Sequence, residues 1–266
     1  MDGQLLPRRR VLLWSSPRSL STAFERSIRE LESVKVIGEP HLRAYYYGPE
    51  RRRESTHQPD QSELDDSATY EAAAAKLLGE YDGYEAVFAK DLAYYIEGKY
   101  EKYLQGGFSH FKHTFLIRHP LKSIPSLIRA SEKCGLSAPL NDIGIKQLYH
   151  FYKTVQQSVD PHPIVIDADD LLAHPKATME HYCKGTGLPF DEKMLTWQPC
   201  EFQEWLSYKY HKEFFGTVMA SSGFLKPRSH STTVGDLSKE AQDVYREVLP
   251  FYEAMYQERF QPANSC

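Results

Sequence analysis

The sequence predicts a three-layer α/β/α domain with a central parallel sheet of about five strands. Short apolar runs of strand length alternate along the chain with segments whose apolar residues recur at helical spacing. The chain has 266 residues, a length that suits one large α/β domain. Because no repeat or low-complexity linker divides it, we expect a single domain over residues 1–266.

The expected strands are brief apolar runs bounded by charged or turn-forming residues. The first, Val-Leu-Leu-Trp, lies between a basic cluster and a Ser-Ser-Pro turn, and the second ends at Gly38. Continuous apolar runs of this length are typical of strands that helices cover on both faces. The five expected strands are residues 11–14, 34–37, 86–90, 113–117 and 163–167.

The expected helices lie between and after these strands. In the first, Phe24, Ile28 and Leu31 share one face. Residues 48–67 begin with a Gly-Pro turn and carry basic and then acidic residues, so they are expected to form a polar surface insertion. The expected helices are residues 21–31, 68–81, 121–133 and 147–159, followed by a mainly helical part from about residue 176 that closes with residues 239–256.

The composition excludes several classes of protein. With 41% hydrophobic and 26% charged residues the chain resembles an ordinary packed protein, and its net charge of -4 argues against a nucleic-acid partner. No apolar run is long enough to span a bilayer, and the run after the N-terminal arginines is too short for a signal peptide. The four cysteines lack zinc-like spacing, so we expect reduced thiols, no metal, no membrane partner and a cytoplasmic location.

The turn after the first strand carries the first candidate binding site. It connects a strand to a helix, where backbone N–H groups and the helix dipole face an anion. Arg18 adds charge-assisted hydrogen bonds, and neighbouring hydroxyls add further donors. The turn contains no glycine, so it is not a Walker A loop. The alternative is a plain strand–helix turn with an exposed arginine.

A second candidate anion site follows the fourth strand. Arg118 stands just beyond residues 113–117, and Ser126 lies on the next helix, from which it can reach the same anion. The alternative is that Arg118 pairs with a carboxylate and Ser126 bonds within its helix. Both sites lie at carboxyl ends of strands, the edge at which open parallel sheets bind ligands. Two sites on one edge favour ligand binding over either alternative.

Both sites resemble those of sulfotransferases that use 3′-phosphoadenylyl sulfate (PAPS). The turn is similar to the 5′-phosphosulfate loop P-[KR]-[ST]-G-T, with Leu20 and Ser21 in place of the usual Gly-Thr. The second site is similar to the 3′-phosphate motif R-x-P-x-x-[DS]-x-x-S, through Arg118, Pro120, Ser123 and Ser126. The resemblance implies that the phosphosulfate is bound by Pro17, Arg18, Ser19, Leu20, Ser21 and Thr22.

The resemblance continues along most of the chain. Residues 169–175 are similar to the E-D-L-x-x-x-P segment of this superfamily, and Gly187-Leu188-Pro189 to its G-L-P. The whole sequence is most similar to a little-studied branch that includes plant proteins with an aminotransferase-like name. The resemblance implies a P-loop fold, PAPS as the donor, PAP as the product, a small-molecule acceptor and no metal.

Sulfuryl transfer needs a base for the acceptor's proton and positive charge for the leaving group. Glu39 follows the second strand and resembles the base of tyrosylprotein-type sulfotransferases, whereas His41 is the rival, since cytosolic sulfotransferases use a histidine. Lys90-Asp91 ends the third strand and resembles a K-D pair whose lysine stabilises the transferring group. Arg18 would contact that group too. We expect Glu39, Lys90 and Arg18 to lie in one pocket, because the strands that carry them end at one edge.

The C-terminal half offers one further candidate. Residues 221–228 are polar, basic and glycine-containing, so Ser222 and Gly223 are candidates for closing over the 3′-phosphate, as a basic loop does in many sulfotransferases.

Two other functions remain open at this point. One is a P-loop kinase or NTPase, which would need the missing glycines, a lysine and a magnesium site. The other is a nucleotide-binding scaffold without turnover, for which the departure at Leu20 is the one hint. Aminotransferase activity has little support, because nothing identifies a Schiff-base lysine. The acceptor, the choice between Glu39 and His41, and the oligomeric state stay open.

Overall fold

The computed structural model describes residues 9–52, 59–206, 208–225 and 232–262. Its centre is one all-parallel sheet in the order β2-β3-β1-β4-β5. Each strand contains or closely matches one of the five predicted runs, so the predicted sheet is confirmed. The strands are β1 (Arg9–Ser15), β2 (Val34–Gly38), β3 (Ala86–Leu92), β4 (Lys112–Ile117) and β5 (Ile164–Asp167).

Helices fill most of the remaining chain. The short helix α2 was not predicted, and the predicted C-terminal helical part consists of several separate helices, among them the short α8. In the described parts of the predicted insertion, residues 48–52 and 59–67, Gly48 is buried and the other residues are half-buried or exposed. The α-helices are α1 (Ser21–Ile28), α2 (Leu42–Tyr46), α3 (Tyr70–Leu78), α4 (Pro120–Lys133), α5 (Ile145–Ser158), α6 (Ala168–Ala173), α7 (Pro175–Thr186), α8 (Gln203–Leu206), α9 (His211–Met219) and α10 (Lys239–Gln257).

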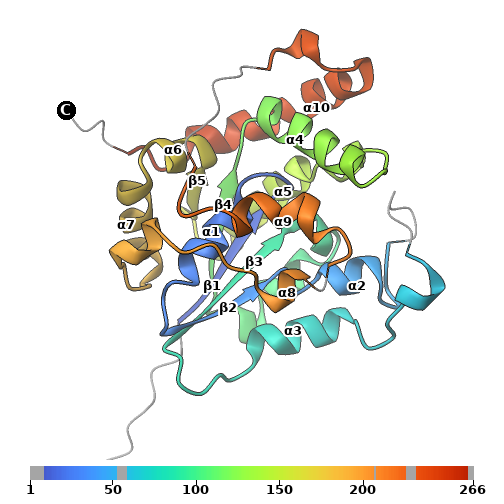
Figure 1. Ribbon diagram of the computed structural model, residues 1–266. Helices are drawn as coiled ribbons and strands as arrows, with labels where there is room; N and C mark the ends of the chain where they lie inside the picture. The colour runs from blue at the N-terminus through green and yellow to red at the C-terminus, as the bar shows by residue number, and fades with distance from the viewer. Residues whose placement is uncertain (1–8, 53–58, 207, 226–231, 263–266) are drawn as a thin grey trace, which may run out of the picture.

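Two apolar layers hold the helices against the sheet. Along β1, Leu12 and Trp14 point to one layer, and Val11 and Leu13 to the other, as the two-residue period of a strand requires. Helices α3, α4, α5 and α10 pack on the first face, and α1, α6 and α7 on the second (Figure 1). Burying each large apolar side chain contributes about 1.5–3 kcal/mol. The result is the predicted three-layer arrangement.

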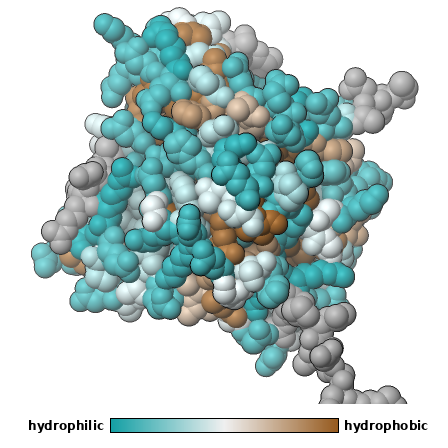
Figure 2. All heavy atoms as spheres, turned by 180° about the vertical axis from the view of Figure 1, so that it is seen from behind, coloured by the Kyte–Doolittle hydropathy of each residue, from teal (hydrophilic) through white to brown (hydrophobic). Residues whose placement is uncertain are grey.

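The surface of the described residues is mainly hydrophilic. Seen from the side opposite to Figure 1, hydrophobic residues form small patches among polar side chains (Figure 2). Leu78, Val159 and Leu225 are the large hydrophobic residues that are exposed within the described ranges. In these same ranges, the helices are either too short or too polar to cross a bilayer.

The strand order determines where a ligand can bind. β1 lies in the middle, between β3 and β4; the chain passes from β1 to β2 and β3 on one side and then crosses to β4 and β5 on the other. Ligands of open parallel sheets bind at such a switch point, beyond the carboxyl ends of the strands. The segments that follow β1, β2 and β4, together with the end of β3, therefore share one edge of the molecule.

Candidate active site

The turn between β1 and α1 has an unusual backbone. Arg18 has a φ of 63° and Leu20 a φ of 70°, which places both in the left-handed region. This conformation costs a non-glycine residue roughly 1–2 kcal/mol, and such strain is often found at functional sites. Leu20 thus adopts the conformation that glycine takes readily, so the leucine leaves the shape of the turn intact.

Helix α1 begins at this turn with free amide groups. No side chain caps its first turn, and no acidic residue lies there. The first N–H groups of a helix have no partner within it, and the helix dipole favours an anion beside them. Ser21, Thr22 and Ala23 line a cavity at this end. The start of α1 therefore offers backbone donors to an anionic ligand.

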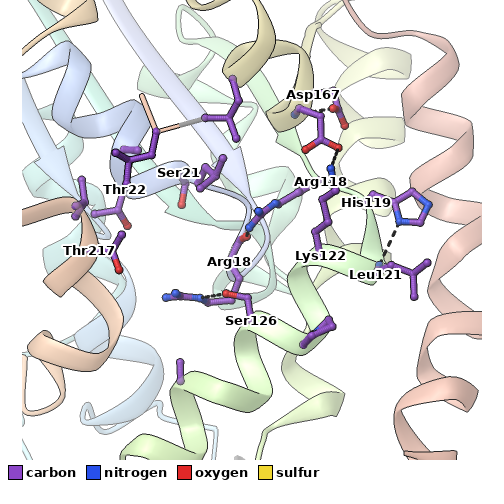
Figure 3. Close-up of a pocket in the computed structure, with 18 of the residues that line it drawn as sticks. Arg18, Ser21, Thr22, Arg118, His119, Leu121, Lys122, Ser126, Asp167 and Thr217 are labelled. Carbon is purple, nitrogen blue, oxygen red and sulfur yellow. Dashed lines mark hydrogen bonds and ion pairs between the residues drawn. The ribbon is translucent and has the colours of Figure 1, made fainter. Parts of the chain in front are cut away.

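Three polar side chains connect the turn to α4. Arg18 Nε donates to Ser126 Oγ at 3.1 Å, and Arg18 Nη1 donates to the carbonyl oxygen of Phe214 at 3.2 Å. Arg118 Nη1 donates to the carbonyl oxygen of Arg18 at 2.8 Å. Figure 3 shows Arg18 pointing toward Ser126, and Arg118 toward the turn. The structure thus brings the two predicted anion sites together.

These groups line a cavity of about 1540 Å³ that α4, α9 and α10 help to enclose; we call it the arginine cavity. Ser19 is buried, and its hydroxyl donates to the carbonyl oxygen of Ser16 at 2.7 Å, so it shapes the turn instead. Pro17 and Ser222 do not line the cavity either. The predicted residues that do line it are Arg18, Leu20, Ser21, Thr22, Arg118, Ser126 and Gly223.

Three arginines, Arg18, Arg118 and Arg129, line the arginine cavity. Burial, together with the nearby charges of Arg118 and Arg129, lowers the pKa of Arg18 to about 10. Burial also lowers the pKa of Arg118, although Asp169 and Asp167 act against this. Arg118 Nε is buried and has no hydrogen-bond partner within the described residues. A buried guanidinium with an unused N–H is suited to a phosphate oxygen.

A second cavity, of about 680 Å³, contains the other candidate residues; we call it the glutamate cavity. Lys90 Nζ lies 2.5 Å from Glu39 Oε1 and 3.5 Å from Glu25 Oε2. The hydroxyl of Tyr95 donates to Glu39 Oε2 at 3.1 Å. Lys90 is only 1% exposed, and burial alone would lower its pKa, but Glu39 and then Glu25 outweigh burial, so the pKa is raised. The buried lysine is therefore held as a cation between two carboxylates.

The structure places the two candidate bases differently. Glu39 lines the glutamate cavity and has a left-handed φ of 39°. His41 is fully buried and lines neither cavity. Its Nδ1 lies 2.6 Å from Asp91 Oδ2, and its Nε2 lies 2.6 Å from the hydroxyl oxygen of Tyr103. Both ring nitrogens of His41 are thus engaged inside the protein.

The expectation that Arg18 and Glu39 share one pocket is wrong in this structure. Arg18 lines the arginine cavity, whereas Glu39 and Lys90 line the other. Helix α9 separates them: Phe214 lines the first cavity and its neighbour Phe215 lines the second. The strand ends do share an edge, as predicted, but a helix from the C-terminal part of the chain packs between them.

Sequence reasoning missed two charged residues at these cavities. Arg129 lies one helical turn after Ser126 on α4, a spacing that puts both on one face. Glu25 lies on α1 and is buried beside the apolar residues Phe24 and Ile28. A charged residue on the apolar face of a predicted helix is unusual, and this signal could have pointed to Glu25.

Other predicted features are only partly described. Residues 226–231 lie outside the described ranges, so the predicted basic loop 221–228 can be followed only to Leu225. Gly223 forms an isolated antiparallel bridge with Thr196, and Ser221 accepts a hydrogen bond from Trp197 Nε1 at 3.0 Å. Among the residues that the structure describes, no three His, Cys, Asp or Glu side chains form a possible metal site.

Two solved structures are similar to this fold. A sulfotransferase from Alicyclobacillus acidocaldarius matches with a TM-score of 0.54 and 13% identity, covering 97% of this chain and 99% of that one. The sulfotransferase domain from the curacin biosynthetic pathway matches with a TM-score of 0.50 and 15% identity, covering 91% and 98%. At these identities the likeness establishes the fold.

Sequence relatives carry two kinds of name. Branched-chain-amino-acid aminotransferase-like protein 2 of Arabidopsis thaliana is 28% identical over 257 residues, which cover 91% of this chain and 40% of that protein. This chain therefore spans less than half the length of its plant relative. Sulfotransferase ppzF of Metarhizium majus is 33% identical over 108 residues, 34% of this chain and 32% of that protein.

The family comparison covers nearly the whole chain. A family model described as "Sulfotransferase domain" matches residues 9–259, a range that includes the sheet, both cavities and α10. It agrees with the sulfotransferase fold of the solved structures and with the plant branch that the sequence resembled. The chain belongs to the sulfotransferase family.

Proposed function

We propose that this protein transfers the sulfuryl group of PAPS to a small-molecule acceptor and releases PAP. The observation that supports this most is the convergence of Arg18, Arg118 and the uncapped start of α1 on the arginine cavity. A donor with a phosphosulfate at one end and a 3′-phosphate at the other needs two anion sites. The buried Arg118 Nε, with no partner within the described residues, fits a phosphate oxygen.

The donor's two ends would be bound by different residues. The turn of Arg18 and the amides of Ser21 and Thr22 would bind the phosphosulfate, and Arg118 with Ser126 would bind the 3′-phosphate. Arg18 donates to neutral oxygens in the free protein. Exchanging them for an anionic oxygen gives stronger, charge-assisted hydrogen bonds. Binding the donor is therefore expected to draw Arg18 away from Phe214.

The acceptor would bind in the glutamate cavity, whose volume suits a small molecule. Glu39 accepts the proton of the acceptor's hydroxyl while that oxygen bonds to sulfur and the bond from sulfur to the phosphate oxygen breaks. Lys90 supplies positive charge beside the reacting groups. His41, enclosed by Asp91 and Tyr103, orients the turn that carries Glu39.

Transfer requires the two cavities to communicate. Helix α9 lies between them, and its Phe214 carbonyl accepts a hydrogen bond from Arg18. When the donor binds Arg18, the hydrogen bond from Arg18 to Phe214 breaks, and α9 can shift. In this mechanism, donor binding opens the path between the phosphosulfate and Glu39.

A ligand screen by thermal unfolding tests the proposal. PAP and PAPS are expected to stabilise the protein, by about 2.7 kcal/mol at a hundred times the Kd. ATP with magnesium is the comparison, because it would stabilise a kinase or NTPase. Greater stabilisation by ATP with magnesium than by PAP would overturn the proposal. Stabilisation by PAP without transfer to any phenol or alcohol would instead support a binding scaffold.

A further inference from the structure

Glu25 is a buried carboxylate with one oxygen left unused. Its side chain is 0% exposed. Oε1 accepts hydrogen bonds from Arg29 Nε at 3.0 Å, from Arg29 Nη2 at 2.8 Å and from Trp205 Nε1 at 3.2 Å. Oε2 has no hydrogen-bond partner within the described residues and lies 3.5 Å from Lys90 Nζ. A buried carboxylate oxygen without a hydrogen bond is costly, so its retention calls for an explanation.

The end of β2 is shaped around this carboxylate. A Cβ atom at Gly38 would lie 2.9 Å from Glu25 Oε1, closer than real Cβ atoms come, and 3.1 Å from Oε2, which is tighter than most Cβ contacts. The absence of a side chain at Gly38 therefore leaves room for Glu25 directly beside the residue that precedes Glu39. The backbone and α1 together hold the two carboxylates on either side of Lys90.

The Lys90 ammonium loses the compensating charge of Glu39 when Glu39 acts as a base. This ammonium is almost fully buried, and a buried charge without a partner is strongly unfavourable. Once Glu39 takes the acceptor's proton, it becomes neutral and no longer compensates Lys90. The charge of Asp91 also acts on Lys90, but the Asp91 carboxylate already binds His41 and the amide of Leu92.

We propose that Glu25 is a positioning residue, which keeps Lys90 paired while Glu39 takes the acceptor's proton. This rests on the proposed function. As Glu39 becomes neutral, the Lys90 ammonium moves toward Glu25 Oε2, which has its acceptor positions free. Tyr95 stays hydrogen-bonded to the other oxygen of Glu39. Glu25 thus acts through Lys90.

The pairing can be tested first in the protein without ligand. The variant is Glu25→Gln, and the matched control is Glu30→Gln, which removes a carboxylate just beyond the end of α1, where Glu30 pairs with Arg26. The pKa of Lys90 is raised, so its pairing stabilises the protein fully below the usual lysine pKa of about 10.4 and is lost as pH rises through the folded value. Thermal unfolding between neutral and alkaline pH is measured.

The unfolded-state pKa sets the pH at which the alkaline loss of stability begins, and the folded-state pKa of Lys90 sets where it ends. In Glu25→Gln the loss is therefore expected to be smaller, and to end at a lower pH, than in wild type and in Glu30→Gln. The same size and end point of the loss in all three proteins would overturn the inference. This measurement needs no donor or acceptor, so it decides the matter even if the proposed function fails.

The second measurement is the pH dependence of kcat with ³⁵S-labelled PAPS and 4-nitrophenol. In Glu25→Gln we expect kcat to fall on the order of 10–100-fold, because protonating Glu39 leaves Lys90 unpaired. The acidic limb of the pH profile of kcat should move to lower pH, while the Kd for PAP stays within about twofold of the wild-type value. Glu25→Asp keeps the charge and should restore the limb.

A merely structural role for Glu25 would reduce the amount of folded protein and leave the acidic limb unchanged, which would overturn the inference. A wild-type protein that transfers sulfate to no acceptor would overturn the proposed function alone, and the unfolding profile would still report on Glu25.

Discussion

The two cavities differ in whether carboxylates pair with their buried cations. In the arginine cavity, the hydrogen bonds described for Arg18 and Arg118 go to a hydroxyl and to carbonyl oxygens, and the pKa of both arginines is lowered. In the glutamate cavity, Lys90 lies between two carboxylates, and its pKa is raised. A site that binds an anion keeps positive charge uncompensated until the ligand arrives. A site that moves a proton keeps its charges paired.

The largest expected effect is at Glu39. Glu39→Gln keeps the shape of the side chain but cannot take up the acceptor's proton, so turnover should fall ~10²–10⁴-fold. Calorimetry should give a Kd for PAP near the wild-type value, because the proposed PAP site is the other cavity. His41→Asn is the comparison and should reduce turnover much less than Glu39→Gln does. A greater loss in His41→Asn than in Glu39→Gln would exchange the roles of the two residues.

Arg18→Ala should weaken donor binding and turnover together. Each hydrogen bond to a charged group contributes about 1.5–3 kcal/mol, so we expect the Kd for PAP to rise roughly 10–100-fold. Arg246→Ala is a suitable control, because it removes an exposed arginine that pairs with Asp243 on α10. An unchanged Kd for PAP in Arg18→Ala would remove Arg18 from the donor site.

Arg118→Ala should have a narrower effect than Arg18→Ala. PAP should lose about tenfold or more in affinity, since a charge-assisted contact to its 3′-phosphate is lost. Adenosine 5′-phosphosulfate has no 3′-phosphate and should bind almost as well as to wild type. Calorimetry with both ligands distinguishes the two ends of the donor. Equal losses for the two would show that Arg118 does not bind the 3′-phosphate.

The smallest expected effect concerns the strain at Leu20. Leu20→Ala and Leu20→Gly both remove the side chain, but only glycine relieves the left-handed φ of 70°. The glycine variant should therefore be more stable than the alanine variant by about 1 kcal/mol, as measured by urea unfolding. At an ordinary position the order is reversed. A less stable glycine variant would show that the turn is not strained.

The sheet, and the shared edge that carries the Arg18 and Arg118 segments, could be predicted because their signals are local. A short apolar run followed by a polar turn defines each strand end, and parallel strands bring those ends to one edge. The position of α9 could not be predicted in this way. Its contact with the turn joins Arg18 to Phe214, which lies 196 residues further along the chain. The sequence around either residue contains no pattern that predicts this contact. Glu25 was missed for a related reason, because its role depends on Lys90 from a different strand.

The placement of Phe214 and Phe215 on opposite sides of one wall has a thermodynamic consequence. A shift of α9 would change the shape of both cavities at once, so under the proposed function the donor and the acceptor would not bind independently. Coupling between two sites is reciprocal: the factor by which PAP changes the affinity for an acceptor equals the factor by which that acceptor changes the affinity for PAP. We therefore expect equal heterotropic effects in both directions, with a coupling free energy of about 1–3 kcal/mol. Substitutions in α9 should alter this coupling more than either affinity alone.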